Sequence, residues 1–167
     1  PQQVGVVNTW AAISAGAASS FAVRHNGTLW AFGRNVDGQL GVGDTTNRSS
    51  PTQVGTSTLW TRVAAGYNHA MGLRSDGTLW TWGNNSQGQL GLDATSPPIT
   101  SPVVVDGSTS WSGVFAGYQV SMGVNGPSAV EIASRQAFYD TPGTYSFVVP
   151  QGVTSVCALA IGGGGGG

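Results

Sequence analysis

The side chains that could perform acid–base or nucleophilic chemistry are few and widely spaced in this sequence. Glu131 is the only glutamate, and the six aspartates are Asp37, Asp44, Asp76, Asp93, Asp106 and Asp140. His25 and His69 have no carboxylate beside them, so the chain offers no Ser–His–Asp pattern. Serine and threonine are too plentiful for any one of them to stand out as a nucleophile. We therefore predict no catalytic residues and no enzymatic activity.

Metal-ligating patterns are equally weak. Asn35, Asp37 and Gly38 have the spacing of the start of a calcium-binding loop, but the twelve-residue ligand spacing and the closing Glu are missing. The related segment 85–88 has no carboxylate at all. Cys157 is the only cysteine, which excludes an intrachain disulfide and a cysteine-based zinc site, and we expect it to be a small buried residue. We predict no bound metal and no cofactor.

The chain carries very little charge. Charged residues make up 8% of it and the net charge is −1, against roughly 25% charged residues in an average soluble domain. All six basic residues are arginines, so neither a P-loop lysine nor a Schiff-base lysine is available. Nucleic-acid binding needs clustered cations, which six arginines spread along the chain do not provide. A membrane span needs about 20 apolar residues, whereas the longest apolar run is 156–161. We expect neither a nucleic-acid partner nor membrane insertion.

A repeat of about fifty residues organises most of the sequence. Its markers are a tryptophan, an Asn/Asp-Gly-Thr-Leu-Trp segment and a Gly-Gln-Leu-Gly segment: Trp10, Trp60 and Trp111; 26–30 and 76–80; 38–41 and 88–91. A proline-led segment, 51–54 or 102–105, closes each unit. Such a period indicates units that stack on one another, because a single unit cannot bury its faces alone.

Each unit is predicted to form four short strands. Apolar residues alternate with polar neighbours at Phe21, Val23, Leu29 and Ala31, and again at Met71, Leu73, Leu79 and Thr81. Asn26-Gly27 and Asp76-Gly77 predict hairpins with type I′ turns, in which both central residues have positive φ. Four strands in about fifty residues are typical of a propeller blade. The predicted fold class is all-β: a partial array of β-propeller blades followed by a C-terminal glycine-rich β segment.

The repeated tryptophans are predicted to be structural rather than ligand-binding. Large aromatic residues at fixed repeat positions fill the space between stacked blades. The residues concerned are Trp10, Trp30, Trp60, Trp80 and Trp111. Truncating one of them is expected to cost about 3–5 kcal/mol.

The motifs in residues 1–124 resemble the regulator of chromosome condensation repeat. The second unit carries the pattern in order: Trp60-x-x-Val63-x-Ala65-Gly66-x-x-His69, Asp76-Gly77-x-Leu79-x-x-Trp82-Gly83-x-Asn85, and Gly88-Gln89-Leu90-Gly91. The resemblance implies a propeller, usually of seven four-stranded blades. It also implies an interaction platform, since members include a nucleotide exchange factor on chromatin, secreted bacterial β-lactamase inhibitors and phage proteins.

The sequence departs from this pattern at several places. Ser19 and Val120 occupy the positions equivalent to His69, so we expect His69 to be a hydrogen-bonding blade residue rather than a ligand. Segment 1–5 matches the end of a unit, and the third unit follows the pattern only to Val124. We expect residues 1–124 to hold the end of one repeat, two complete repeats and the start of a third. Such an array would not close alone, so either upstream repeats or several copies would complete it.

The remainder is predicted to contain a linker, 125–137, and a glycine-rich β segment, 138–167. Segment 129–138 is either a strand or a short helix, and the strands expected in the second part surround a turn at 150–152. The stretch TPGTYSFVVPQGVTSV, which precedes six glycines, resembles the glycine-rich domain of bacteriophage tail-fibre and other virion proteins. Its glycines would either pack in tight layers or form a disordered linker.

These features together suggest a non-enzymatic structural or adhesion component of a bacteriophage virion, a tail fibre or related appendage. The blades would be a rigid binding platform, with other virion proteins, copies of the chain or a host-surface receptor as partners. The alternative is a secreted bacterial protein-binding module that resembles a propeller inhibitor. The sequence does not identify the partner-binding residues, which we expect on the loops between strands.

Overall fold

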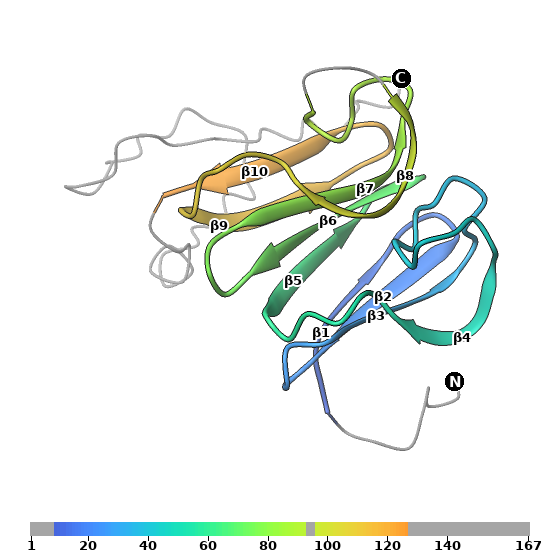
Figure 1. Ribbon diagram of the computed structural model, residues 1–167, viewed down its shortest axis with the longest axis horizontal. Coiled ribbons are helices and arrows are strands. Elements are labelled where there is room, and N and C mark those ends of the chain that lie inside the picture. The colour runs from blue at the N-terminus through green and yellow to red at the C-terminus, as the bar shows by residue number, and fades with distance from the viewer. Residues whose placement is uncertain (1–8, 93–95, 127–167) are drawn as a thin grey trace, which may run out of the picture. The chain divides into compact units, whose positions relative to one another are not determined.

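The computed structural model describes residues 9–92 and 96–126, all within one compact unit, Pro1–Ser134. Every regular element in this part of the chain is a β-strand, which confirms the predicted all-β class (Figure 1). The strands are β1 (Trp10–Ala15), β2 (Ser19–Arg24), β3 (Leu29–Gly33), β4 (Arg48–Gln53), β5 (Trp60–Ala65), β6 (His69–Arg74), β7 (Leu79–Asn85), β8 (Ser96–Val104), β9 (Trp111–Ala116) and β10 (Ser121–Asn125). The expected glycine-rich segment 138–167, with Cys157, and nearly all of the expected linker 125–137, with Glu131, lie outside the described residues.

The ten strands form three antiparallel sheets that follow the repeat. β1–β4 make one four-stranded blade in sequence order, here called blade 1, and β5–β8 make blade 2. The β9–β10 hairpin begins a third unit, here called the third hairpin. Within each blade every strand pairs with the next one along the chain, and the first two connections of each blade are short turns. The predicted partial array of four-stranded repeats is therefore present.

The turns between β2 and β3 and between β6 and β7 differ from the expected type I′. Gly27 N donates to Arg24 O at 2.8 Å, and Arg24 N donates to Thr28 O at 2.9 Å, which leaves a three-residue loop. Gly27 has φ +76°, whereas no described non-glycine residue, Asn26 included, has a positive φ. This is a type I turn followed by a glycine bulge. The predicted turn type was wrong because an extra residue separates the strand ends, although the need for glycine was predicted correctly.

The core lies between successive blades. The eight alternating residues predicted from the sequence are all at most 6% exposed: Phe21, Val23, Leu29, Ala31, Met71, Leu73, Leu79 and Thr81. Val63 of β5 joins the cluster of β2 and β3, and Val114 of β9 joins the cluster of β6 and β7. Each blade thus covers the apolar face of the one before it, as stacking repeats require.

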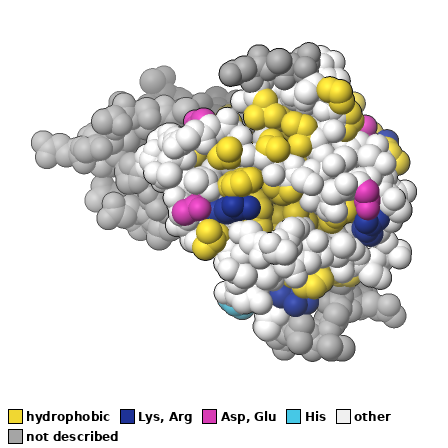
Figure 2. All heavy atoms as spheres, viewed as in Figure 1, with side chains coloured by type: hydrophobic (Ala, Val, Ile, Leu, Met, Phe, Trp, Pro, Cys, Tyr) yellow, Lys and Arg dark blue, Asp and Glu magenta, His cyan; other side chains and the backbone are white. Residues whose placement is uncertain are grey.

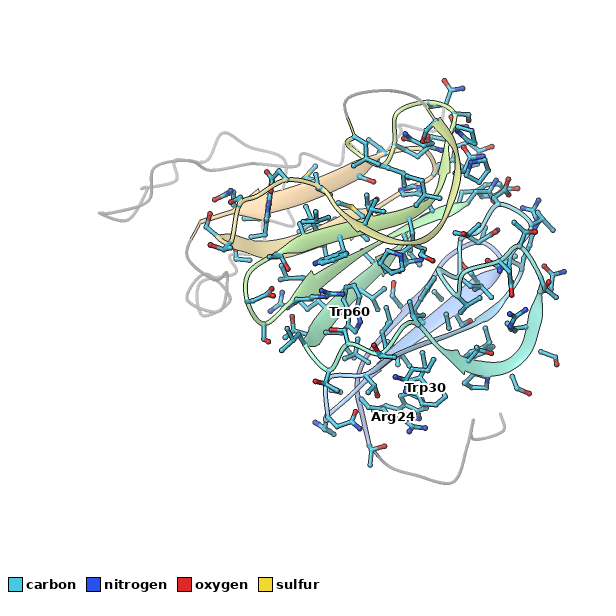
Figure 3. The ribbon with its side chains drawn as sticks, in the orientation of Figure 1. Arg24, Trp30 and Trp60 are labelled. Atoms are coloured by element: carbon cyan, nitrogen blue, oxygen red, sulfur yellow. The ribbon has the colours of Figure 1, made fainter. Side chains whose placement is uncertain are left out.

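The predicted tryptophan core is correct for Trp60, which is 2% exposed, but the other four are half-buried. Trp30 lies beneath Arg24, whose guanidinium carbon is 4.2 Å from the ring centroid (Figure 3). Arg74 lies at 3.6 Å over Trp80 and at 4.5 Å over Trp60. Trp30, Trp60 and Trp80 therefore hold an arginine at the end of each hairpin. The attraction of the guanidinium charge to the face of the aromatic ring stabilises this contact.

Trp82 is the most deeply placed tryptophan and was not among those expected in the core. It is fully buried, and its indole nitrogen donates to Gln39 O at 2.9 Å, across the boundary between the blades. Its ring meets Phe21 and Trp60 edge to face at centroid distances of 6.0 and 5.9 Å. It therefore joins blade 2 to blade 1 by both packing and a hydrogen bond.

Candidate binding face on the loops between strands

The β1–β2, β5–β6 and β9–β10 turns lie together with the loops that follow β3 and β7. Because neighbouring strands are antiparallel, the first turn and the third connection of a blade emerge at the same end. Arg34 N donates to Ala18 O and Asn84 N donates to Asn68 O, both at 2.8 Å, which joins turn to loop within each blade. Tyr67 N donates to Gly117 O at 3.2 Å, which joins successive turns. We call this end, residues 16–18, 34–47, 66–68, 84–92 and 117–120, the loop face.

A buried asparagine holds each of the two long loops of this face. Asn35 and Asn85 are fully buried at the start of equivalent loops. Their side-chain oxygens accept hydrogen bonds from Leu40 N at 2.9 Å and from Leu90 N at 3.1 Å. Each loop is therefore closed on itself by a satisfied buried amide, and buried polar groups that are fully paired fix a single conformation.

The second anchor of the two loops differs between the blades. In blade 1 the Asn35 amide donates to Asp44 O at 2.8 Å, and Asp44 is paired with Arg48. The hydrogen bond from Arg48 holds the pKa of Asp44 below its ordinary value, with the Thr46 backbone helping. In blade 2 the Asn85 amide donates instead to the Ser96 hydroxyl at 3.1 Å. Asp44 therefore has a structural role in the first loop, as the ion-pair partner of Arg48.

A polar network crosses the boundary between the blades on this face. Arg34 donates to the Asn68 side-chain oxygen at 3.0 Å and pairs with Asp37 at 3.5 Å. Asn84 donates to Asp37 at 3.4 Å. Asp37 was considered in the sequence as a faint calcium ligand, and the structure places it in this network. Among residues 9–92 and 96–126, no group of three His, Cys, Asp or Glu side chains is arranged to hold a metal ion.

Two tyrosines project from neighbouring turns of the loop face. The rings of Tyr67 and Tyr118 lie with their centroids 4.6 Å apart and their planes tilted by 46°. The two residues are 41% and 65% exposed. Within the described part of the chain, neither phenol oxygen has a hydrogen-bond partner. The pair therefore offers both apolar ring surface and free hydroxyl groups to a ligand.

His69 is buried behind this face and contacts the third hairpin. Its Nε2 lies 3.0 Å from Ser121 Oγ, and Ser121 Oγ donates to Gln89 O at 2.6 Å. The serine has one hydroxyl proton, which the carbonyl takes, so His69 Nε2 is the donor to Ser121. Burial lowers the pKa of His69 below its ordinary 6.5, and the Val120 backbone offsets this only in part. A serine whose proton is directed away from the histidine is not an activated nucleophile.

Shallow grooves lie at the opposite ends of the blades, beside the β2–β3 and β6–β7 hairpins. Arg24 and Leu59 line the first, and Arg74 and Thr109 line the second. The two grooves occupy equivalent positions of the repeat, so they follow from blade stacking. The face seen in Figure 2 carries few charged side chains among uncharged surface. No helix among the described residues is long and apolar enough to cross a membrane.

Two features of the site were missed by the sequence interpretation although the repeat contained their signal. Arg24 and Arg74 recur at an interval of 50 residues, and Tyr67 and Tyr118 recur after the same Ala-Gly pair at an interval of 51. The exposed tyrosines lie on loops between strands, where the sequence interpretation expects partner-binding residues, and that expectation stays a prediction. The sequence could not show which loop residues are exposed, because the exposure of each tyrosine ring depends on how the turn of the neighbouring unit packs beside it.

Two sequence models for the regulator of chromosome condensation (RCC1) repeat match this chain. One matches residues 26–73 and 76–124, and the other matches residues 10–39 and 60–89. Neither extends beyond residue 124. A search of curated protein sequences finds no match.

Solved structures share the fold at low sequence identity. "Crystal structure of human WBSCR16" matches with 23% identity and a TM-score of 0.67, over 75% of this chain and 33% of that chain. Prp20p from Saccharomyces cerevisiae, a protein described as binding Gsp1p and histones, matches with 20% identity and a TM-score of 0.66, over 80% of this chain and 35% of that chain. The chain thus spans about a third of the length of these proteins.

Proposed function

This chain belongs to the regulator of chromosome condensation repeat family, and from that premise we propose that it is a non-enzymatic binding platform in a bacteriophage tail fibre or related virion appendage. The blades act as a stiff support, and the loop face contacts the partner. The partner is a host-surface receptor or another virion protein.

The observation that carries the proposal is the combination of a rigid scaffold with exposed aromatic rings. Asn35 and Asn85 fix the two long loops from within. Tyr67 and Tyr118 are presented from adjoining turns, at an end where main-chain hydrogen bonds connect successive units. Binding residues on loops held by a rigid scaffold lose little conformational freedom when a ligand is bound.

The chemistry of the described residues supports binding rather than catalysis. His69 is buried and donates to Ser121, whose proton is directed at a backbone carbonyl. Asp37 and Asp44 are engaged by Arg34 and Arg48 in ion pairs. Elemental analysis and a broad hydrolase screen of the purified chain test this. We expect no metal and no turnover; a stoichiometric metal, or turnover lost on Asp37→Asn, would contradict it.

The assignment to a virion rests on sequence features. The glycine-rich segment 138–167 resembles segments of tail-fibre proteins, and the low proportion of charged residues, 8%, suits packing into a rigid particle. Two observations test it: the genes that flank the full reading frame, and mass spectrometry of purified phage particles. We expect tail or baseplate genes alongside and peptides of this chain in the particles. Recovery of the protein from particle-free medium would favour the secreted binding module instead.

A further inference from the structure

We propose that the loop face binds a neutral saccharide, with its sugar rings against Tyr67 and Tyr118. The inference rests on the proposed binding function and names the chemical class of the receptor. The ligand is identified by its chemistry: apolar C–H faces that pack on aromatic rings, and hydroxyl groups that need both donors and acceptors.

The blade fold does not require the two tyrosines. The equivalent residue of blade 1, in the same turn, is Ala17, and the two turns are closed by the same internal backbone hydrogen bond. Gly16 N donates to Ser19 O and Gly66 N donates to His69 O, both at 2.9 Å. A residue that alanine replaces without changing the turn is not needed for folding. Tyr67 stays 41% exposed although the turn of the third hairpin lies beside it, and Tyr118 on that turn is 65% exposed, so the two rings offer a contact surface.

The geometry of the pair suits a chain of sugar rings. The ring planes are tilted by 46° rather than stacked in parallel, so the two outer ring surfaces face different directions. A saccharide of two or more residues could place one ring on each tyrosine. Tyrosine provides this contact at a small entropic cost, since only two side-chain torsions have to be fixed.

The polar groups beside Tyr67 complement hydroxyl groups without favouring a charged ligand. Asn68 follows Tyr67 directly and is held by Arg34, which pairs with Asp37. The Arg34 side chain is 41% exposed and the Asp37 side chain is 21% exposed, so both retain contact with solvent. Guanidinium, carboxylate and carboxamide groups together supply donors and acceptors with no net charge. A phosphate or acidic ligand would need an excess of cations here.

Aromatic residues also bind proline-rich peptides, which are the competing ligand class. Such peptides are recognised in grooves between aromatic rings, through an apolar surface. Tyr67 and Tyr118 lie on turn tips beside an ion pair and a carboxamide, a setting that matches hydroxyl groups better. The peptide is therefore a comparison arm of the test.

The experiment is a saturation-transfer difference NMR titration of the full 167-residue chain with neutral oligosaccharides of glucose, galactose and N-acetylglucosamine, and with a proline-rich peptide. We expect saturation transfer to the C–H protons of at least one saccharide. Tyr67→Ala and Tyr118→Ala should each weaken binding by about tenfold, the size of one aromatic contact of about 1.4 kcal/mol. Tyr118→Phe, which keeps the ring, should lose less. Leu59→Ala, at the opposite end of the blade and 42% exposed, is the matched control and should bind as the parent does.

Thermal midpoints of the variants should stay within about 5 °C of the parent, since each tyrosine variant loses little more than the contact between the two rings. A folded variant that does not bind separates loss of the site from loss of the fold. The inference is overturned if no neutral saccharide binds, if the peptide alone binds, or if Leu59→Ala weakens binding as much as the tyrosine variants. Adhesion of the parent chain to host bacteria tests the proposed function separately. Adhesion that survives in the Tyr67→Ala, Tyr118→Ala double variant rejects the saccharide site and leaves the platform function standing. Saccharide binding without adhesion rejects the host-receptor function alone.

Discussion

Blade 1 and blade 2 are built from one repeat, and their common residues are those that shape a single blade. Both have a three-residue hairpin loop that ends in glycine, Gly27 or Gly77. Both place an arginine over tryptophan rings at that hairpin. Both close the loop after their third strand with a buried asparagine. The turn hydrogen bonds, the stacked arginine and the asparagine hydrogen bond are all contacts within one repeat, so each blade carries them.

The two blades differ where one unit meets the next. Phe32 of β3 is half-buried, whereas its equivalent in β7, Trp82, is fully buried against blade 1. Ser19 is replaced by His69, which reaches Ser121 of the third hairpin. The same rule explains Ile13, which is 81% exposed in β1, while the equivalent Val63 is 9% exposed because blade 1 covers it. Residues that are the same in both repeats therefore shape the single blade. Residues that differ between the repeats lie at the junctions between units and on the loop face.

The largest effect that we predict is from removing the junction tryptophan. Trp82→Ala deletes a fully buried indole and leaves Gln39 O without its donor. We expect a loss of about 3–5 kcal/mol in the free energy of unfolding, the usual range for a buried aromatic residue. Urea denaturation of the chain measures it.

Phe32→Ala in blade 1 is the matched comparison. Phe32 is partly exposed, so its truncation should cost less than half as much as that of Trp82. Trp82→Phe, which keeps an aromatic ring but removes the N–H, should fall between the two. Equal losses for Trp82→Ala and Phe32→Ala would show that the two positions are not distinguished by the junction.

The second prediction tests a feature that the blades share. Gly77→Val should destabilise the chain by at least about 2 kcal/mol, because valine is disfavoured at φ +76° and left-handed backbone costs about 1–2 kcal/mol by itself. A side chain here would also overlap the Thr109 carbonyl, at the segment that leads into β9. Gly27→Val should behave alike, since it would overlap the Thr58 carbonyl. Denaturant midpoints decide the matter.

Gly88 separates the two causes of this loss. It has φ +75°, similar to that of Gly77, but nothing lies within 4 Å of a Cβ built there. Gly88→Ala should therefore cost only the backbone strain, about 1–2 kcal/mol. If Gly88→Ala and Gly77→Ala were equally destabilising, the close approach of the next unit to the hairpin would contribute nothing.

The sequence predicted features that recur and missed those that arise between units. The strand residues, the two hairpin glycines and the four-stranded unit followed from alternation and period. The turn type was wrong because the Asn-Gly signal does not fix the loop length; the pairing of Arg24 with Thr28 does. Trp82 and the tyrosine pair depend on which neighbour a side chain meets, and that is a property of stacking rather than of local sequence. The glycine-rich segment and the virion assignment stay predictions.

The third prediction concerns the arginines on the tryptophans, a feature that the blades share. Arg74→Met keeps an apolar stem but removes the cation over Trp60 and Trp80, and we expect a loss of about 1 kcal/mol. Burial lowers the pKa of Arg74, with the Asp76 charge opposing it, which agrees with a partly desolvated guanidinium. Arg24→Met should cost a similar amount. Arg62→Met, on an exposed position of β5, is the control and should change stability by less than about 0.5 kcal/mol.

The smallest effect is a pH dependence that only blade 2 carries, because blade 1 has Ser19 where blade 2 has His69. Burial lowers the pKa of His69 below 6.5, so the unfolded chain binds a proton more readily than the folded chain does. The contribution of His69 to stability is then fully present above pH 6.5 and is lost as the pH falls toward its folded pKa. Asp44 and Asp76, whose pKa values are lowered below 3.8, lose their contribution to stability only below about pH 5. Urea midpoints between pH 7 and pH 5 therefore isolate the histidine: His69→Gln should show a flatter decline than the parent chain, while His25→Gln, at an exposed hairpin position, should follow the parent. Parallel curves for all three proteins would mean that His69 is protonated as easily in the folded junction as in the unfolded chain.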